Sequence, residues 1–303
     1  MKIGFVSAIL ADYNFEQMVD YASKIQMDYV EVACWPMGKA ERRYAGVTHI
    51  DMDSLDDAKA VEINEYLAKK NVNISAIAYY PNPLDPDPAV REVAFSHLKK
   101  CILGARKLGL KNVNTFIGRD PKASLPESME QFKKLWPDTI KFAEDNDIKI
   151  GIENCPMFYS MDEWPGGKNL ATCPAIWEDM FSIIPSDHFG LNYDPSHMAL
   201  QRMDYIQPVY DFKDKIFHFH VKDIQFYQDK FDKVGFMAPT LAYHTPKLPG
   251  LGVIDWGKMM SAMYDIGFAG PAIIEVEDRA FEGSLEDILY SVELSGRYMK
   301  NFI

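Results

Sequence analysis

Eight short runs rich in apolar, β-branched and aromatic residues recur along the whole chain of 303 residues. Several are nearly continuously apolar, which is typical of parallel strands covered by helices. Most of the intervals between them carry apolar residues with helical periodicity. This alternation predicts an α/β fold, a single (β/α)8 TIM barrel that spans residues 1–303 as one domain. The runs are Lys2–Val6, Tyr29–Ala33, Ile74–Tyr80, Asn112–Ile117, Lys149–Asn154, Phe189–Asp194, Ile216–Val221 and Ala272–Val276.

Several residues indicate where the predicted helices begin or bend. Asn14 is expected to cap the first helix. The segment Ser54-Leu55-Asp56-Asp57 is typical of a capping box and predicts a helix that continues to residue 70. Pro137 predicts a kink in the helix expected between residues 126 and 146. Thr172 is the expected cap of the helix that precedes the sixth strand.

The main competing fold is a doubly wound open sheet with a nucleotide site. That architecture carries a G-x-G-x-x-G motif after its first strand, and none follows Lys2–Val6, so we expect no nucleotide cofactor. The longest stretch without predicted structure is a loop at 224–251, after the seventh strand. A loop of this length in a compact domain is usually functional or disordered, and its aromatic content favours a functional role.

The charge balance excludes several kinds of partner. Lys and Arg number 32 and Asp and Glu number 44, which gives a net charge of −12. Proteins that bind phosphate backbones usually carry a basic patch, so we expect no nucleic-acid partner. No apolar stretch approaches the roughly 18 residues of a membrane helix, so no membrane partner is expected. Four cysteines without a C-x-x-C pair favour a reducing cytoplasm, and a homo-oligomer is left open.

Four consecutive predicted strands end in a carboxylate or an imidazole within apolar sequence: Glu153, Asp194, His220 and Glu275. Active sites of such barrels lie at the carboxyl ends of the strands. Three buried carboxylates without a partner would be costly, because like charges raise each other's pKa. One divalent cation would resolve the conflict. Oxygen-rich ligation with one nitrogen suits Mn²⁺ or Mg²⁺, with Co²⁺ and Zn²⁺ as alternatives, and we expect Mn²⁺.

Other polar and aromatic residues near these strand ends allow two interpretations. Lys222 is either a solvated charge or a substrate contact. Trp35 and Tyr79 end the second and third strands, where they either pack against the barrel or stack on a ring of the substrate. His218 shares a strand face with His220 and lies deeper in the barrel. It is therefore expected to be a hydrogen-bonded core residue or to support a metal ligand, rather than to bind the ion itself.

Short motifs follow the predicted strands in a characteristic order. With them, the chain resembles the xylose-isomerase-like TIM barrel superfamily along essentially its full length. In pattern it is most similar to the sugar phosphate isomerase/epimerase group, which includes ketose 3-epimerases, hydroxypyruvate isomerase and inosose dehydratase. The motifs are Glu153-Asn154, Asp194-Pro195-Ser196-His197, His220-Val221-Lys222-Asp223, the segment Pro249–Trp256 and the lone Glu275.

The resemblance implies a role for each matched residue. Glu153 and Glu275 would each bind the metal and also move protons, whereas Asp194 and His220 would only bind the metal. His197 would contact the substrate beside the metal.

The chain also departs from the ketose 3-epimerases. It has Phe226 where they carry an arginine and Tyr159 where they carry a glutamate. The pair Lys222-Asp223 is more similar to inosose dehydratase.

The expected activity is that of a metal-dependent sugar isomerase or epimerase, acting on a small-molecule carbohydrate. One glutamate would remove the proton next to a carbonyl, and an enediolate would form. The alternative is a dehydratase or lyase acting on a keto-sugar or keto-inositol, in which a β-hydroxyl leaves from the same enediolate. Two further alternatives are a DNA-repair enzyme similar to endonuclease IV, which the acidic charge disfavours, and a sugar-binding barrel with a closed structural metal site.

Overall fold

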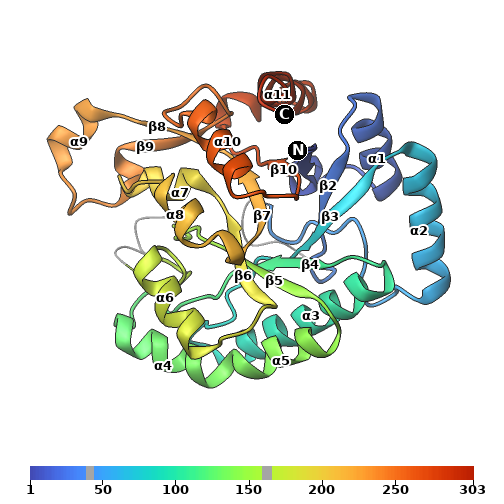
Figure 1. Cartoon of the computed structure of the whole chain (residues 1–303), viewed down its shortest axis with the longest axis horizontal. Helices are drawn as coiled ribbons and strands as arrows, with labels where there is room; N and C mark the ends of the chain where they lie inside the picture. Colours follow the sequence, from blue (N-terminus) through green and yellow to red (C-terminus); the bar gives the residue numbers. More distant parts are fainter. Residues whose placement is uncertain (39–43, 159–165) are drawn as a thin grey trace.

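Eight parallel strands close into a barrel in the computed structural model, which describes residues 1–38, 44–158 and 166–303 (Figure 1). The order around the barrel is β1-β10-β7-β6-β5-β4-β3-β2, and each predicted run overlaps one strand. The predicted single (β/α)8 barrel is therefore confirmed. The strands are β1 (Ile3–Val6), β2 (Tyr29–Ala33), β3 (Asn73–Ala78), β4 (Asn112–Thr115), β5 (Lys149–Glu153), β6 (Phe189–Tyr193), β7 (Ile216–Val221) and β10 (Ala272–Ile274).

Helices surround the barrel and bury their apolar faces against it (Figure 1). The helices α7, α8 and α9, which follow β6 and β7, are short. Of these, α7 and α8 form the connection between β6 and β7. The helices are α1 (Phe15–Lys24), α2 (Asp57–Lys70), α3 (Pro88–Lys107), α4 (Leu125–Leu135), α5 (Pro137–Asp145), α6 (Pro174–Ile183), α7 (Pro195–Leu200), α8 (Gln207–Asp211), α9 (Gln228–Val234), α10 (Trp256–Asp265) and α11 (Leu285–Met299).

Two of the predicted helix boundaries are confirmed and two are wrong. Asn14 caps α1 in a full capping box, and Pro137 separates α4 from α5. The cap of α2 is Asp56, which accepts from the backbone N of Lys59 at 2.8 Å, because Ser54 lies in the preceding turn. The residue at the cap of α6 is Cys173 rather than Thr172, since Pro174 opens the helix and presets its backbone.

The segment expected as the loop 224–251 contains regular structure. Strand β8 (Asp223–Phe226) pairs antiparallel with β9 (His244–Lys247), and α9 lies between them. The rings of Phe226, Phe231 and Tyr243 pack together at centroid distances of 5.1–5.5 Å. The expectation of an irregular segment is therefore wrong: three of its aromatic residues pack on one another, whereas Phe236 is 73% exposed.

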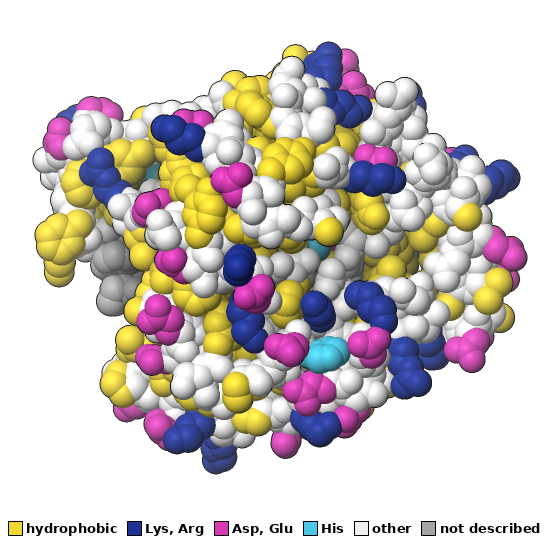
Figure 2. Space-filling view, in the orientation of Figure 1, with side chains coloured by type: hydrophobic (Ala, Val, Ile, Leu, Met, Phe, Trp, Pro, Cys, Tyr) yellow, Lys and Arg dark blue, Asp and Glu magenta, His cyan; other side chains and the backbone are white. Residues whose placement is uncertain are grey.

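The surface seen in Figure 2 shows basic and acidic side chains interspersed on this face. Among the described residues, no helix combines the length and apolar character that a membrane span requires.

Candidate metal centre and substrate cavity

A cavity of about 970 Å³ lies at the carboxyl ends of the barrel strands. Its floor is polar, with Glu153, Lys222 and Glu275, and aromatic side chains including Trp35 and Tyr80 line its walls. This volume lies at the upper end of the range for small-molecule sites. The position agrees with the rule that barrel enzymes place their sites on this face.

The four predicted metal ligands converge at this floor: Glu153 and Glu275 line the cavity, and Asp194 and His220 are buried beside them. Glu153 ends β5, Asp194 follows β6, His220 lies in β7 and Glu275 follows β10. Each offers one ligand atom, and these atoms all lie within 4.8 Å of one another. The side chains of Glu153, Asp194 and His220 are buried, and that of Glu275 is 18% exposed. The structure therefore brings together the residues that the strand ends predicted.

Asp194 holds its two carboxylate oxygens in different environments. Oδ1 accepts from the backbone N of Ser196 at 2.8 Å and so caps α7. The backbone of Asp194 forms two hydrogen bonds with the side-chain amide of Asn154. Oδ2 is buried and accepts no hydrogen bond within the described part of the chain, and its charged neighbours are Lys222 Nζ at 3.2 Å and His197 Nε2 at 3.4 Å. A buried carboxylate oxygen of this kind fits a cation, so the donor set present is suitable for a divalent metal.

Lys222 places a positive charge inside the same cluster. Its side chain is 2% exposed, and Nζ lies 2.6 Å from Glu275 Oε2, 3.1 Å from Glu277 Oε2 and 3.2 Å from Asp194 Oδ2. Burial alone would lower the pKa of Lys222, but the charges of Glu275 and Glu277 outweigh it and raise this pKa well above its ordinary value. Lys222 is therefore a buried cation in contact with the candidate ligands rather than a solvated charge.

The other predicted substrate contacts divide into two groups. His197 lines the cavity, and its Nε2 lies 3.2 Å from Glu153 Oε1. Trp35 also lines it. The assignment of Tyr79 is wrong, because its ring is buried edge-on against Trp35 and His97 and Tyr79 does not line the cavity. The neighbouring Tyr80 lines the cavity instead.

Asp223 holds the segment 249–256 against the carboxyl end of the seventh strand. Its carboxylate accepts from the backbone N atoms of Ile254 and Gly250 at 3.0 and 3.1 Å, and from Trp256 Nε1 at 3.0 Å. A Cβ atom at Gly252 would lie 2.2 Å from Asp223 Oδ1, so this position requires glycine. Asp223 thus ties the segment to the start of β8, directly after Lys222.

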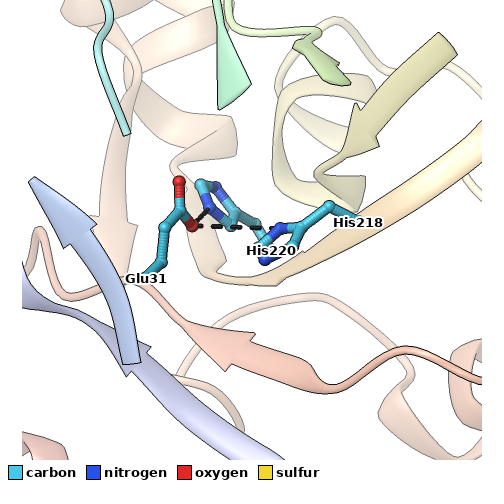
Figure 3. A group of neighbouring side chains, drawn as sticks. All are labelled: Glu31, His218 and His220. Atoms are coloured by element: carbon cyan, nitrogen blue, oxygen red, sulfur yellow. Dashed lines mark hydrogen bonds and ion pairs between the residues drawn. The ribbon is translucent and has the colours of Figure 1, made fainter. Parts of the chain in front are cut away.

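Sequence reasoning missed a buried carboxylate below the metal cluster. Glu31 of β2 is fully buried and faces His218 and His220 of β7 (Figure 3). The nitrogens of His218 lie 2.9 Å from Asn192 Oδ1 and 3.0 Å from Ser75 Oγ, which supports its expected role in the core. The available signal for Glu31 was a lone acid between Val30 and Val32 in an apolar strand.

The two departures from the ketose 3-epimerase pattern lie in different regions. Phe226 belongs to β8, where the guanidinium of Arg202 lies 4.1 Å from its ring centroid. Phe226 is uncharged and packs within this aromatic cluster, so it cannot offer a substrate the charge of the arginine that it replaces. Tyr159 lies outside the described residues.

Two curated proteins are similar to this chain in sequence. The uncharacterized protein YfiH of Bacillus subtilis is 23% identical over 92% of this chain and 93% of its own length. A D-psicose 3-epimerase of Enterocloster bolteae is 21% identical over 86% of this chain and 76% of its own.

Solved structures share the fold at lower identity. D-psicose 3-epimerase with D-fructose has a TM-score of 0.72 at 14% identity, and the IolI protein with a bound zinc atom has 0.73 at 17%; each covers 100% of this chain and 99% of its own. The probable 3-DHS dehydratase AsbF of Bacillus anthracis has 0.66 at 13%, over 98% of this chain and 99% of its own. The family model described as the xylose isomerase-like TIM barrel matches residues 19–294. The chain therefore belongs to the xylose isomerase-like TIM barrel family.

Proposed function

We propose that the protein is a divalent-metal-dependent sugar isomerase or epimerase that moves a proton at a carbon next to a carbonyl. The observation that carries this proposal is the convergence of Glu153, Asp194, His220 and Glu275 in the floor of a cavity. Oδ2 of Asp194, which is buried without a hydrogen bond among the described residues and faces the ammonium of Lys222 at 3.2 Å, supports a cation at their centre. Mn²⁺ is the proposed ion, with Mg²⁺, Co²⁺ or Zn²⁺ as alternatives.

The bound ion would act as a Lewis acid that polarises the substrate carbonyl and stabilises the negative charge of an enediolate. Asp194 and His220 would serve only as ligands. Glu153 and Glu275 would bind the ion and also exchange a proton with the substrate. Their positions on β5 and after β10 place one carboxylate on each side of the cluster formed by β6 and β7.

The charge states of the two glutamates suit this work. Burial alone would raise the pKa of Glu275, but the charge of Lys222 outweighs it and lowers this pKa to about 2. The pKa of Glu153 is lowered in the same sense, because the hydrogen bond from His197 and the charge of Lys222 outweigh its burial. Both groups are therefore ionised at neutral pH and available as bases. For epimerisation one removes the proton and the other supplies one to the opposite face; for isomerisation the proton returns to the neighbouring carbon.

His197, Lys222 and Trp35 would hold the substrate in the cavity, and Tyr80 takes the place proposed for Tyr79. The ammonium of Lys222 can bind a sugar oxygen where negative charge develops. The four cysteines are free thiols, which fits a cytoplasmic enzyme.

A dehydratase acting on a keto-sugar or keto-inositol is the second candidate. The buried Lys222 beside the cluster and the aromatic environment of Phe226 favour it, because neither matches the ketose 3-epimerase pattern. In this reaction one of the two glutamates would remove the α-proton, and the carboxylic acid so formed would protonate the β-hydroxyl, which leaves as water.

Exchange of the substrate's α-proton with D₂O tests both candidates. We would screen keto-sugars, keto-inositols and their phosphates with the Mn²⁺-loaded protein. Exchange with retention of all hydroxyls supports the isomerase or epimerase, and exchange with loss of water supports the dehydratase. Full activity in metal-free protein would contradict the mechanism, and cleavage of abasic DNA would favour an endonuclease instead.

A further inference from the structure

We infer that Glu31 is a positioning residue for the metal centre, which fixes the tautomer and the orientation of His220 so that Nδ1 faces the metal cluster. The inference rests on the proposed function in one respect, that His220 is a metal ligand. It adds a residue from β2, on the other side of the barrel mouth from β5 and β6, to the machinery that prepares the site.

The two nitrogens of His220 lie in different surroundings. Nε2 lies 2.5 Å from Glu31 Oε2, toward the barrel interior (Figure 3). Nδ1 lies 3.4 Å from Glu275 Oε2 and 3.7 Å from Glu153 Oε1, in the metal cluster. An imidazole that binds a metal through one nitrogen carries its proton on the other and donates it there. The short contact with Glu31 makes Nε2 that donor and leaves the lone pair of Nδ1 for the metal.

Glu31 is itself held in one place. Its Oε1 accepts from Tyr80 Oη at 2.6 Å and from Asn114 Nδ2 at 3.2 Å. Tyr80 Oη and Asn114 Nδ2 both donate to Oε1, which leaves Oε2 as the acceptor for the proton on Nε2 of His220.

The other polar neighbour of His220 does not change this assignment. Asn192 Nδ2 lies 3.1 Å from His220 Nε2, but an amide nitrogen cannot accept the ring proton. The same Nδ2 donates to Tyr80 Oη at 2.9 Å. Among the described groups, Glu31 is therefore the partner that receives the Nε2 proton.

Glu31, His218 and His220 could also be considered as a second metal site, because their ligand atoms lie close together. The hydrogen bonds argue against this. Both oxygens of Glu31 accept hydrogen bonds, and both nitrogens of His218 have partners. Metal binding there would require several of these buried hydrogen bonds to break, so the group acts as a support for the site above it.

The position of the metal bond can be measured directly in wild-type protein loaded with ¹¹³Cd²⁺ and labelled with ¹⁵N-histidine. We expect ¹¹³Cd–¹⁵N coupling at Nδ1 of His220 and a proton on its Nε2. Coupling at Nε2 would overturn the inference while leaving the proposed metal site intact. A wild-type protein that binds no ion would overturn both.

The variant Glu31→Gln tests the positioning role. Glutamine has nearly the same size but one oxygen, which cannot accept from Tyr80 and Asn114 and also from His220. We expect the affinity for Mn²⁺ to fall about 10- to 100-fold in titration calorimetry, as for lost partners of metal-bound histidines. The matched control is Ser75→Ala, which removes a partner of His218 and leaves the Glu31–His220 contact in place, and should keep wild-type affinity. Wild-type affinity in a folded Glu31→Gln protein would overturn the inference; the ¹¹³Cd experiment decides if that variant does not fold.

Discussion

The ammonium nitrogen of Lys222 lies 2.6 Å from Oε2 of Glu275, one of the four proposed metal ligands. It also lies 3.2 Å from Asp194 Oδ2, so the lysine contacts the same carboxylate oxygens that a divalent cation would bind. The carboxylate of Glu277, at 3.1 Å, is a third acceptor, at the cavity wall. Lys222 can keep this partner when an ion takes the others, so the lysine compensates the cluster's negative charge and competes with the metal.

Replacing this lysine should strengthen metal binding. In Lys222→Met the competing charge is lost, and we expect the affinity for Mn²⁺ to rise about tenfold or more, since tenfold corresponds to only about 1.4 kcal/mol. Titration calorimetry on metal-stripped protein measures the change. The control is Lys247→Met, because Lys247 lines the same cavity but pairs with Asp278 at 3.1 Å rather than with a proposed ligand. A weaker affinity in Lys222→Met would show that the lysine supports the ion instead.

Glu275 should be essential for proton transfer. The variant Glu275→Gln keeps the shape of the side chain but removes the base, and we expect α-proton exchange with D₂O to fall about 10²- to 10⁴-fold. Proton NMR of the substrate in D₂O measures the rate. Glu286→Gln, at an exposed position in the first turn of α11, is the control and should exchange at the wild-type rate. Exchange retained in Glu275→Gln would remove this residue from the proposed mechanism.

The four metal ligands that the sequence predicted share one property: each lies at the end of an apolar run. Glu153 and Asp194 could be placed because the carboxyl ends of parallel strands meet at one face of a barrel. Glu31 lies inside its strand, and its partners Asn114 and His220 are 83 and 189 residues away in sequence. Periodicity carries no information about such distant pairing, so the supporting carboxylate could not be distinguished from an ordinary ion-pair partner.

Two other misses have local causes. Tyr79 and Tyr80 are adjacent, and a shift of one residue in a strand exchanges the two faces, so the aromatic residue at the rim was predicted but the wrong tyrosine was chosen. Strand β9 contains Pro246, which cannot donate to a ladder and is found on edge strands. Its short length and its proline removed the usual strand signal.

Bound metal should stabilise the fold. A ligand that binds only the native state at 100 times its Kd contributes about 2.7 kcal/mol, which would raise Tm by about 5 °C in a protein of this size. Thermal unfolding with increasing Mn²⁺ measures this rise. The variant Glu153→Gln removes one ligand and should show little or no rise. An equal rise in both proteins would place the ion somewhere other than the proposed cluster.

His244 should make the protein less stable in mild acid. Burial lowers its folded-state pKa to about 4, and its Nδ1 donates to the backbone O of Thr240 at 2.5 Å. Below the ordinary pKa of about 6.5, His244 is protonated in the unfolded chain but stays neutral in the folded chain. The free energy of unfolding therefore falls as the pH is lowered from about 6.5 toward 4, by up to about 3 kcal/mol. Urea unfolding of wild type and His244→Gln at pH 7.5 and pH 5 measures this loss. The variant should lose less stability between the two pH values than wild type does, and an identical loss would assign the acid sensitivity to other groups.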